Sequence, residues 1–422
     1  MFKLIANTLG TKIISVLANL LVVVVASQNL GAANMGTISL IILSITIFIQ
    51  INNVVGGPAM VYLLSRHETG TVLFLSYLWL ILTAGIGASI IYVLKLVPPI
   101  YFYHIIILSI LFALLTIHLT VILSKEKIKT YNYILASNPV ILLASLLVFI
   151  YGFGGKDVGS YVKGLYIAYG ITATLSTVFL FVKIKAFRIT NVRTVLKDLL
   201  KFGSIMQLAN ILQLLNYRMN YYLIERFWNK ATLGIYAVGN QVSEGVWLLS
   251  QSTATVLYPK IANSKDRTAQ IRMVLFLIKT IAVLTFLMIA VLLILPNEFY
   301  TYIFGKEFTE TKTVILSLAV GIFFLSLSRI FSTFFSGIGK PQINTIASGI
   351  GLVTVTGLGI WLIPHWAFIG AGIAASVSYF ASFLFLFINF ARKTKSVASD
   401  FYIRKEDIKR LKLELKNIFK NE

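Results

Sequence analysis

The sequence predicts an all-α membrane protein with about twelve transmembrane helices, six in each half of the chain. Its 422 residues are 58% hydrophobic and 12% charged, whereas a soluble domain is about 45–50% apolar and about 25% charged. The apolar residues gather in runs of about 20, the length that crosses a bilayer as a helix. Inside lipid every backbone amide must be bonded within the protein, so these runs are predicted to be helices.

The apolar runs define the predicted spans one by one. They cover residues 4–28, 37–62, 72–94, 101–123, 134–153, 162–182, 202–224, 233–257, 273–295, 313–335, 342–363 and 366–390. The first run is too long for a removed signal peptide and lacks the small-residue cleavage pattern. No loop between spans is long enough to hold a soluble domain. We therefore expect the function to reside in the membrane or at its two rims.

The basic residues predict the orientation of these spans. When the spans alternate across the membrane, most of the 37 Lys and Arg residues fall on the side that also receives both termini. An excess of positive charge marks the cytoplasmic side, so both termini are predicted to be cytoplasmic. The formal net charge of +22 is thus explained by the membrane, and no nucleic acid is expected as a partner.

The most basic internal loop divides the chain into two halves. The predicted domains are an N-terminal six-helix lobe at 1–182, a cytoplasmic linker at 183–201, a C-terminal six-helix lobe at 202–390 and a basic cytoplasmic tail at 391–422. Six is an even number, so the halves share one orientation, as in parallel repeats. Apolar residues at helical spacing in the tail predict an amphipathic helix on the anionic cytoplasmic leaflet.

Two neighbouring spans carry polar stripes. The first stripe is Asn210, Gln213, Tyr217 and Asn220, and the second is Asn240, Glu244, Trp247 and Gln251. Helical spacing places each stripe on one face of its helix. Lipid penalises such faces, which indicates that they line a bundle interior or a water-filled cavity. The alternative is that the amides hold helices together, each pair contributing about 0.6 kcal/mol. The number of amides favours the cavity.

Cations within the spans suggest the charge of the ligand. Arg218 and Arg329 lie within spans, where each either faces the cavity or extends to the membrane surface, and the same choice applies to Lys12. Glu244 is the one acidic residue deep inside a span. The predicted interior is therefore rich in amides and cationic, which suits an anionic ligand or one rich in hydroxyl groups. Arginine binds phosphate through two parallel, charge-assisted hydrogen bonds.

Metal and cofactor sites are not predicted. The chain has no cysteine, which excludes disulfides and thiolate metal sites. Its four histidines are isolated from one another in the sequence. We expect no metal ion, no cofactor and no catalytic residue.

Three segments resemble a known family. They are LLNYRMNYYLIERFWNKATLGIYAVGNQVSEGVWLLSQSTATVLYPKIA at 214–262, SGIGKPQINTIAS at 336–348 and NLGAANMGTISL at 29–40. They are similar to segments of Wzx-type O-antigen and polysaccharide repeat-unit flippases, in the multidrug/oligosaccharidyl-lipid/polysaccharide (MOP) exporter superfamily. The family pattern often has an acidic residue where Asn220 stands, so the resemblance does not extend to an ion-coupling role there.

The resemblance implies a fold and a function. The fold would be MATE-like, with two six-helix lobes around a cationic central cavity. The function would be to move undecaprenyl-diphosphate-linked oligosaccharide units across the bacterial cytoplasmic (inner) membrane, by alternating access, for O-antigen, capsule or exopolysaccharide synthesis. Implied partners are membrane lipids, a polysaccharide polymerase and a chain-length regulator. The candidate substrate-binding residues are Lys12, Asn210, Gln213, Tyr217, Arg218, Asn220, Asn240, Glu244, Gln251 and Arg329.

Three other interpretations remain open at this stage. A MATE-type, cation-coupled drug exporter would need buried carboxylates, and Glu244 is the one candidate. A membrane polysaccharide polymerase or ligase would need a sizeable outer loop with catalytic groups, and no loop of that length is present. A scaffold without transport activity is the third interpretation.

Overall fold

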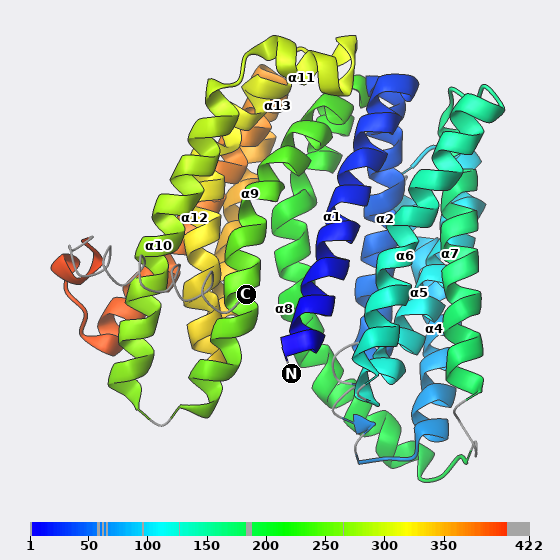
Figure 1. The fold of residues 1–422 in the computed structure, drawn as a ribbon, viewed down its shortest axis with the longest axis horizontal. Coiled ribbons are helices and arrows are strands. Elements are labelled where there is room, and N and C mark those ends of the chain that lie inside the picture. The colour runs from blue at the N-terminus through cyan, green and yellow to red at the C-terminus, as the bar shows by residue number, and fades with distance from the viewer. Residues whose placement is uncertain are drawn as a thin grey trace. The chain divides into compact units, whose positions relative to one another are not determined.

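The computed structural model describes residues 2–56, 60, 63–64, 66–94, 97–125, 127–182, 188–264 and 266–402. The described part of the chain is predominantly helical (Figure 1) and contains no strand. The α-helices are α1 (Phe2–Leu30), α2 (Ala32–Gly56), α4 (Thr69–Leu94), α5 (Phe102–Ser124), α6 (Ile128–Leu147), α7 (Val158–Phe181), α8 (Val192–Phe227), α9 (Lys230–Asn263), α10 (Arg267–Ile294), α11 (Asn297–Phe304), α12 (Thr311–Gly337) and α13 (Gln342–Thr394). Shorter turns are η1 (Pro99–Tyr101), η2 (Val148–Gly152), η3 (Lys306–Phe308) and η4 (Ala398–Phe401).

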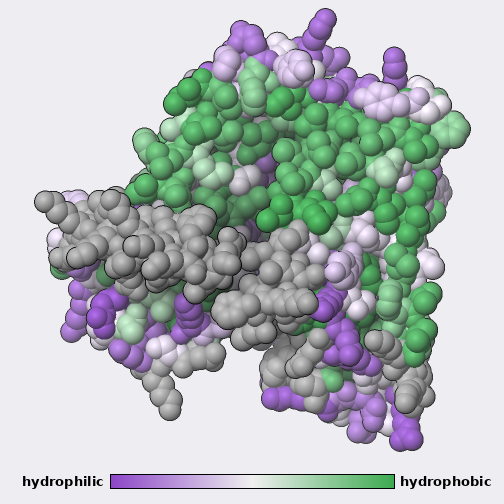
Figure 2. All heavy atoms as spheres, in the orientation of Figure 1, coloured by the Kyte–Doolittle hydropathy of each residue, from purple (hydrophilic) through white to green (hydrophobic). Residues whose placement is uncertain are grey.

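The predicted all-α membrane fold is confirmed. Within the described residues, nine segments are helical, long enough and apolar enough to cross a membrane. Helices α8 and α9 have 36 and 34 residues but fall outside this set, because both carry a polar stripe. Each predicted span nevertheless overlaps a helix, and the last two lie within α13. Figure 2 shows apolar side chains over the middle of the helices and hydrophilic ones at their ends.

One boundary differs from the sequence prediction. Helix α8 begins at Val192, inside the segment predicted as a linker. The early part of α8 is amphipathic, and its apolar residues Val195 and Leu199 are buried, which keeps it helical. The predicted tail helix beyond residue 402 lies outside the described residues.

The last two predicted spans lie within one element, α13, which reverses direction. The backbone leaves helical geometry at Trp366 and at Ala367, whose φ is +46°. Beyond the turn, Ser378 Oγ donates to the carbonyl oxygen of Gly351 at 2.8 Å. This bond joins the two halves of α13 side by side, as expected for two spans connected by a short turn.

The chain forms two compact units that share α8 and α9. Unit 1 contains Met1–Leu214, Trp228–Ala237 and Tyr300–Thr309. Unit 2 contains Leu215–Phe227, Val238–Phe299 and Glu310–Glu422. One end of α8 and one end of α9 belong to unit 1, and the other end of each helix belongs to unit 2.

Unit 1 is held by apolar packing and one buried histidine. Leu115, Leu119 and Ile122 of α5 pack with Ile134 of α6 and Ala173 of α7. On α5, His118 Nε2 lies 2.7 Å from the hydroxyl of Tyr77, and its Nδ1 lies 3.2 Å from the hydroxyl of Ser176. The ring therefore joins α4, α5 and α7 through satisfied hydrogen bonds.

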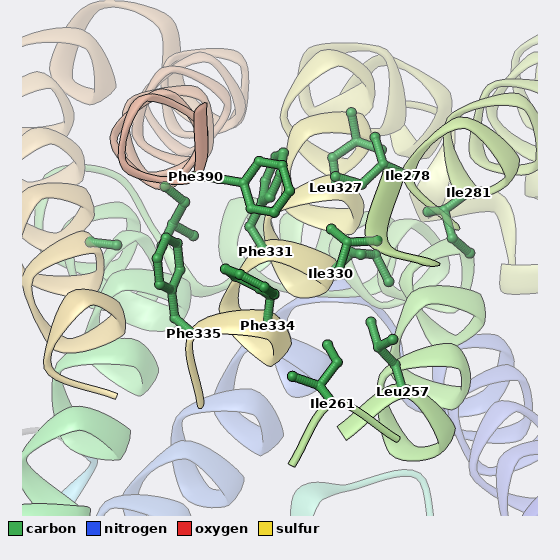
Figure 3. Packing of buried hydrophobic residues seen from close by; sticks show 13 residues of the cluster. Leu257, Ile261, Ile278, Ile281, Leu327, Ile330, Phe331, Phe334, Phe335 and Phe390 are labelled. Atoms are coloured by element: carbon green, nitrogen blue, oxygen red, sulfur yellow. The ribbon is translucent and has the colours of Figure 1, made fainter. Parts of the chain in front are cut away.

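Unit 2 has an aromatic core between α12 and α13 (Figure 3). The rings of Phe331 and Phe390 have centroids 4.9 Å apart, and those of Phe334 and Phe390 are 5.0 Å apart at 77°. The edge-to-face contact between Phe334 and Phe390 stabilises a core beyond its area. Leu257, Ile261, Ile278 and Ile281 from α9 and α10 complete the cluster. This core positions α9 and α12, which carry Glu244 and Arg329.

Candidate functional site

The polar stripes of α8 and α9 meet in unit 2 at an ion pair between Arg218 and Glu244. Arg218 Nη1 lies 2.9 Å from Glu244 Oε1, and Nη2 donates to Oε2 at 3.0 Å. Two parallel, charge-assisted bonds of this kind are the strongest pairing between a guanidinium and a carboxylate. The two side chains are 28% and 25% exposed. The pair is therefore partly buried and still open on one side.

Two neutral groups fix the geometry of this ion pair. Arg218 Nη1 also donates to the hydroxyl of Tyr221 at 2.9 Å. Asn240 Nδ2 donates to Glu244 Oε1 at 2.9 Å and lies 3.3 Å from the hydroxyl of Tyr221. Arg218 and Tyr221 are three residues apart on α8, and Asn240 and Glu244 are four residues apart on α9. Each pair therefore lies on one face of its helix. We call Arg218, Tyr221, Asn240 and Glu244 the Arg218 network.

A cluster of three aromatic side chains from α8, α9 and α13 lies beside the network. The ring of Tyr217 meets Trp247 of α9 edge-on, with centroids 5.5 Å apart, and Tyr379 of α13, with centroids 5.7 Å apart. Trp247 Nε1 is buried and has no hydrogen-bond partner among the described residues. Such rings combine an apolar face with a polar donor. The cluster therefore contains an indole N–H that no described protein group accepts.

Two amides of α8 attach this helix to α13. Asn220 is 1% exposed, and its Nδ2 donates to the carbonyl oxygen of Ala371 at 2.8 Å. The Oδ1 of the buried Asn216 lies 2.6 Å from Ser378 Oγ. Asn220 follows the periodicity of the first stripe, but the structure places it within the packing of unit 2.

The remaining polar candidates are Asn210, Gln213, Gln251 and Lys12. Asn210 and Gln213 are half-buried and belong to unit 1, where Asn210 Nδ2 donates to Gln207 Oε1 at 2.7 Å. Gln251 is half-buried on α9, one turn beyond Trp247. The side chain of Lys12 lies outside the described part of the structure.

Arg329 differs from Arg218 in that no described acidic residue forms an ion pair with it. Its Nε is buried without a hydrogen-bond partner, and no ion pair to Arg329 occurs among the described residues. Ser326, almost one turn earlier on α12, likewise has a buried hydroxyl without a partner among them. An unsatisfied buried donor costs roughly 1–3 kcal/mol, more when charged. Arg329 is therefore a cation with unused binding capacity.

Sequence reasoning missed two residues of this region, Tyr221 and Tyr379. Tyr221 follows Arg218 by three residues, a spacing that indicates contact on a helix, and this signal was available in the sequence. Tyr379 is on α13, and its contact with Tyr217 depends on how α8 packs against α13. No local pattern indicates that contact.

The apolar helices define a multi-pass membrane protein with a MATE-like fold. The structure is similar to that of a lipid II flippase MurJ in an inward closed conformation, with a TM-score of 0.75, 14% identity, and coverage of 95% of this chain and 89% of the other. It is also similar to an inward-facing multidrug resistance MATE transporter of the MOP superfamily, with a TM-score of 0.72, 13% identity, and coverage of 91% and 96%. At these identities the likeness establishes the fold alone.

The sequence comparisons match proteins that are named for polysaccharide or glycan synthesis. Residues 166–313 match the family model described as polysaccharide biosynthesis protein. The chain is 25% identical over 165 residues to the capsular polysaccharide biosynthesis protein CapF of Staphylococcus aureus, and 25% identical over 166 residues to the probable low-salt glycan biosynthesis flippase Agl15 of Haloferax volcanii. Each alignment covers 38% of this chain, and 42% and 35% of the respective relatives. These matches confirm the resemblance predicted from the sequence.

Proposed function

We propose that the protein is a flippase for lipid-linked oligosaccharides. It moves undecaprenyl-diphosphate-linked units across the bacterial cytoplasmic membrane by alternating access, with both termini in the cytoplasm. The proposal combines the MOP-type fold with the similarity to two proteins named for capsular polysaccharide and glycan synthesis. Transport of this kind requires no catalytic residue, cofactor or metal ion.

The observation that carries the proposal is the geometry of Arg218. Its guanidinium already holds two oxygen atoms side by side, at 2.9 and 3.0 Å, in the form of the Glu244 carboxylate. A phosphate group presents two oxygens in the same way and binds arginine in the same bidentate manner. Arg218 is thus preorganised for the diphosphate of a lipid-linked sugar.

The oligosaccharide requires a different surface. We propose that Tyr217, Trp247 and Gln251 contact sugar units, because aromatic rings and amides supply apolar faces and hydrogen bonds together. The Nε1 donor of Trp247 is buried and unused among the described residues. Asn210 and Gln213 provide further amides in unit 1, while Asn220 and Asn240 support their helices. Arg329 and Lys12 are proposed as additional sites for the negative charge of the substrate.

The drug-exporter interpretation is disfavoured by the same geometry. A cation exporter needs a carboxylate that is available to a positively charged drug. Glu244 is the acidic residue of the α8–α9 stripes, and Arg218 and Asn240 already satisfy its oxygens. An organic cation would have to displace a fixed guanidinium from a bidentate pair, which is costly in a partly buried site.

A reconstituted transport assay tests the proposal. The purified protein is incorporated into liposomes with an undecaprenyl-diphosphate oligosaccharide that carries a fluorophore, and a membrane-impermeant quencher reports the leaflet. We expect protein-dependent exchange of the glycolipid between leaflets and no uptake of ethidium, a cationic drug. Ethidium transport without glycolipid exchange would favour the exporter. Absence of both activities in folded protein would contradict the flippase.

A further inference from the structure

We propose that Glu244 acts as an internal counter-anion that determines which lipid headgroups Arg218 accepts. In this proposal the Glu244 carboxylate occupies the anion site until a ligand of greater negative charge replaces it. The inference rests on the proposed function, because it assigns a selection step to the same site. It changes the expected role of Glu244 from contact with the substrate to competition with it.

The first argument is that Glu244 fills the binding face of the guanidinium. Both terminal nitrogens of Arg218 bond to the two carboxylate oxygens, and Nη1 is shared with the hydroxyl of Tyr221. The pair uses the end-on face of the guanidinium, which is formed by the two terminal nitrogens. A phosphate can take this face of Arg218 only when it displaces the carboxylate.

The second argument is that the displaced carboxylate keeps a partner. Asn240 lies one turn earlier on α9, and its Nδ2 donates to Glu244 Oε1 at 2.9 Å. This bond lies within α9 and is independent of Arg218, so it remains when the guanidinium changes partner. Asn240 is 1% exposed and is fixed by the packing of unit 2. The released carboxylate thus keeps one hydrogen bond, and its partly exposed side chain also reaches water.

The third argument concerns charge. A neutral headgroup cannot replace a carboxylate, because it would leave two separated charges in a partly buried site. A monophosphate ester carries about 1.5 to 2 negative charges at pH 7, against one on the carboxylate, so it can also replace Glu244. A diphosphate offers more charge and further oxygens for neighbouring donors. The exchange therefore favours diphosphate lipids over monophosphate and neutral lipids, which is discrimination through an opposing interaction.

The alternative is that the ion pair has a purely structural role and only holds α8 against α9. Both interpretations predict that loss of Glu244 changes stability, so stability does not separate them. They differ in ligand selection. A structural tie predicts that its loss weakens binding of every headgroup to a similar extent, whereas a counter-anion predicts that its loss improves binding of weakly charged anions.

The test compares three prenyl probes that differ only in the headgroup: farnesyl diphosphate, farnesyl monophosphate and farnesol. Affinities are measured by microscale thermophoresis on the full-length protein in nanodiscs of neutral lipid, for wild type and for E244Q. The control is E225Q, which removes a carboxylate from α8 outside the Arg218 network. A thermal melt of each sample reports folding.

We expect wild type to prefer the diphosphate over the monophosphate. In E244Q the monophosphate should bind about tenfold more tightly than in wild type, within the usual range of coupling between sites, and the preference should fall accordingly. E225Q should retain the wild-type preference. If E244Q does not fold, the E244D variant is used for the same comparison. Its side chain is one methylene shorter and no longer reaches both nitrogens, so it should shift selectivity in the same direction.

Two results would overturn the inference in different ways. Wild type that binds the diphosphate, with an unchanged preference in E244Q or E244D, would remove the counter-anion and leave the flippase proposal intact. Wild type that binds neither phosphate probe more tightly than farnesol would contradict the anion site itself, and with it both proposals.

Discussion

Gly36 of α2 lies against the backbone carbonyl of Lys230 at the start of α9. A Cβ atom at Gly36 would collide with this oxygen, and a Cβ at Gly234 would collide with the carbonyl oxygen of Ala32. All four residues belong to unit 1. Small residues at such crossings let two membrane helices approach to backbone contact, which replaces the hydrophobic driving force that lipid does not supply.

We expect Gly36→Ala to destabilise the protein by about 1–3 kcal/mol, because the backbone carbonyl of Lys230 cannot move aside as a side chain would. The free energy of unfolding, measured by SDS titration in mixed micelles, checks this value. Gly85→Ala is the matched control, because nothing lies within 4 Å of its Cβ position. Equal stability of the two variants would show that the crossing tolerates a methyl group.

We expect the cap formed by Asp157 to make a pH-dependent contribution to the stability of the protein. The hydroxyl of Ser160 donates to its carboxylate at 2.7 Å, and the backbone N–H of Ser160 donates at 2.9 Å, so Asp157 caps α7. These bonds lower the pKa of Asp157 below its ordinary value. The folded state therefore binds the proton less readily than the unfolded state, and the stabilisation is lost as the pH falls below the ordinary range of aspartate.

The comparison that isolates this effect is wild type against Asp157→Asn, a cap that does not titrate. Melting temperatures are measured from pH 7 to pH 3. The advantage of wild type over the variant should shrink as the pH decreases, and the change should be small because the side chain is largely exposed. A constant difference over the whole range would show that the carboxylate charge contributes nothing to the cap.

Positions of the helices were predictable from the sequence because a membrane helix bonds its own backbone and needs no knowledge of its neighbours. The Arg218–Glu244 pair was not predictable, because it depends on the register between α8 and α9. Periodicity placed Tyr217 and Asn220 on one face of α8, yet Asn220 bonds to Ala371 of α13. Spacing identifies a face of a helix, whereas packing decides which partner each residue meets.

Accessibility to water should separate these neighbouring residues. The chain has no cysteine, so single cysteines at Asn210, Gln213 and Tyr217 are expected to react with a membrane-impermeant maleimide. Cysteines at Asn216 and Asn220, which are 4% and 1% exposed, are expected to react far more slowly. Mass shift after labelling of intact membranes gives the rates. Fast labelling at Asn220 would show that α8 separates from α13 during transport.

The orientation in the membrane remains a prediction that fusion reporters can check. Alkaline phosphatase is active outside the cytoplasm and green fluorescent protein inside it. Fusions at residues 157 and 304 should give the outer signal and a fusion at residue 265 the inner signal, as the distribution of Lys and Arg indicates. An outer signal at residue 265 would contradict the twelve-span arrangement.

The two arginines should respond differently to substitution. Arg218→Ala removes the anion-binding fork and also leaves Glu244 as an unpaired carboxylate that repels a diphosphate. Arg218→Lys keeps the charge but loses the bidentate geometry. We therefore expect transport to be abolished or severely reduced by the alanine and reduced about tenfold by the lysine. Because Arg329 has no acidic partner among the described residues, Arg329→Ala should reduce transport without affecting the Arg218 network.

The measurement is surface polysaccharide restored in a flippase-deficient strain, normalised to the amount of protein in the membrane. Removing a buried charge does not hinder insertion, so protein levels should stay similar. The double variant Arg218→Ala with Glu244→Gln separates two causes of failure. It removes the repulsion by Glu244 but does not restore the guanidinium of Arg218, and should therefore remain inactive. Full restoration by both single alanine variants would show that neither arginine binds the substrate, and the amides and aromatic rings would then have to account for its recognition.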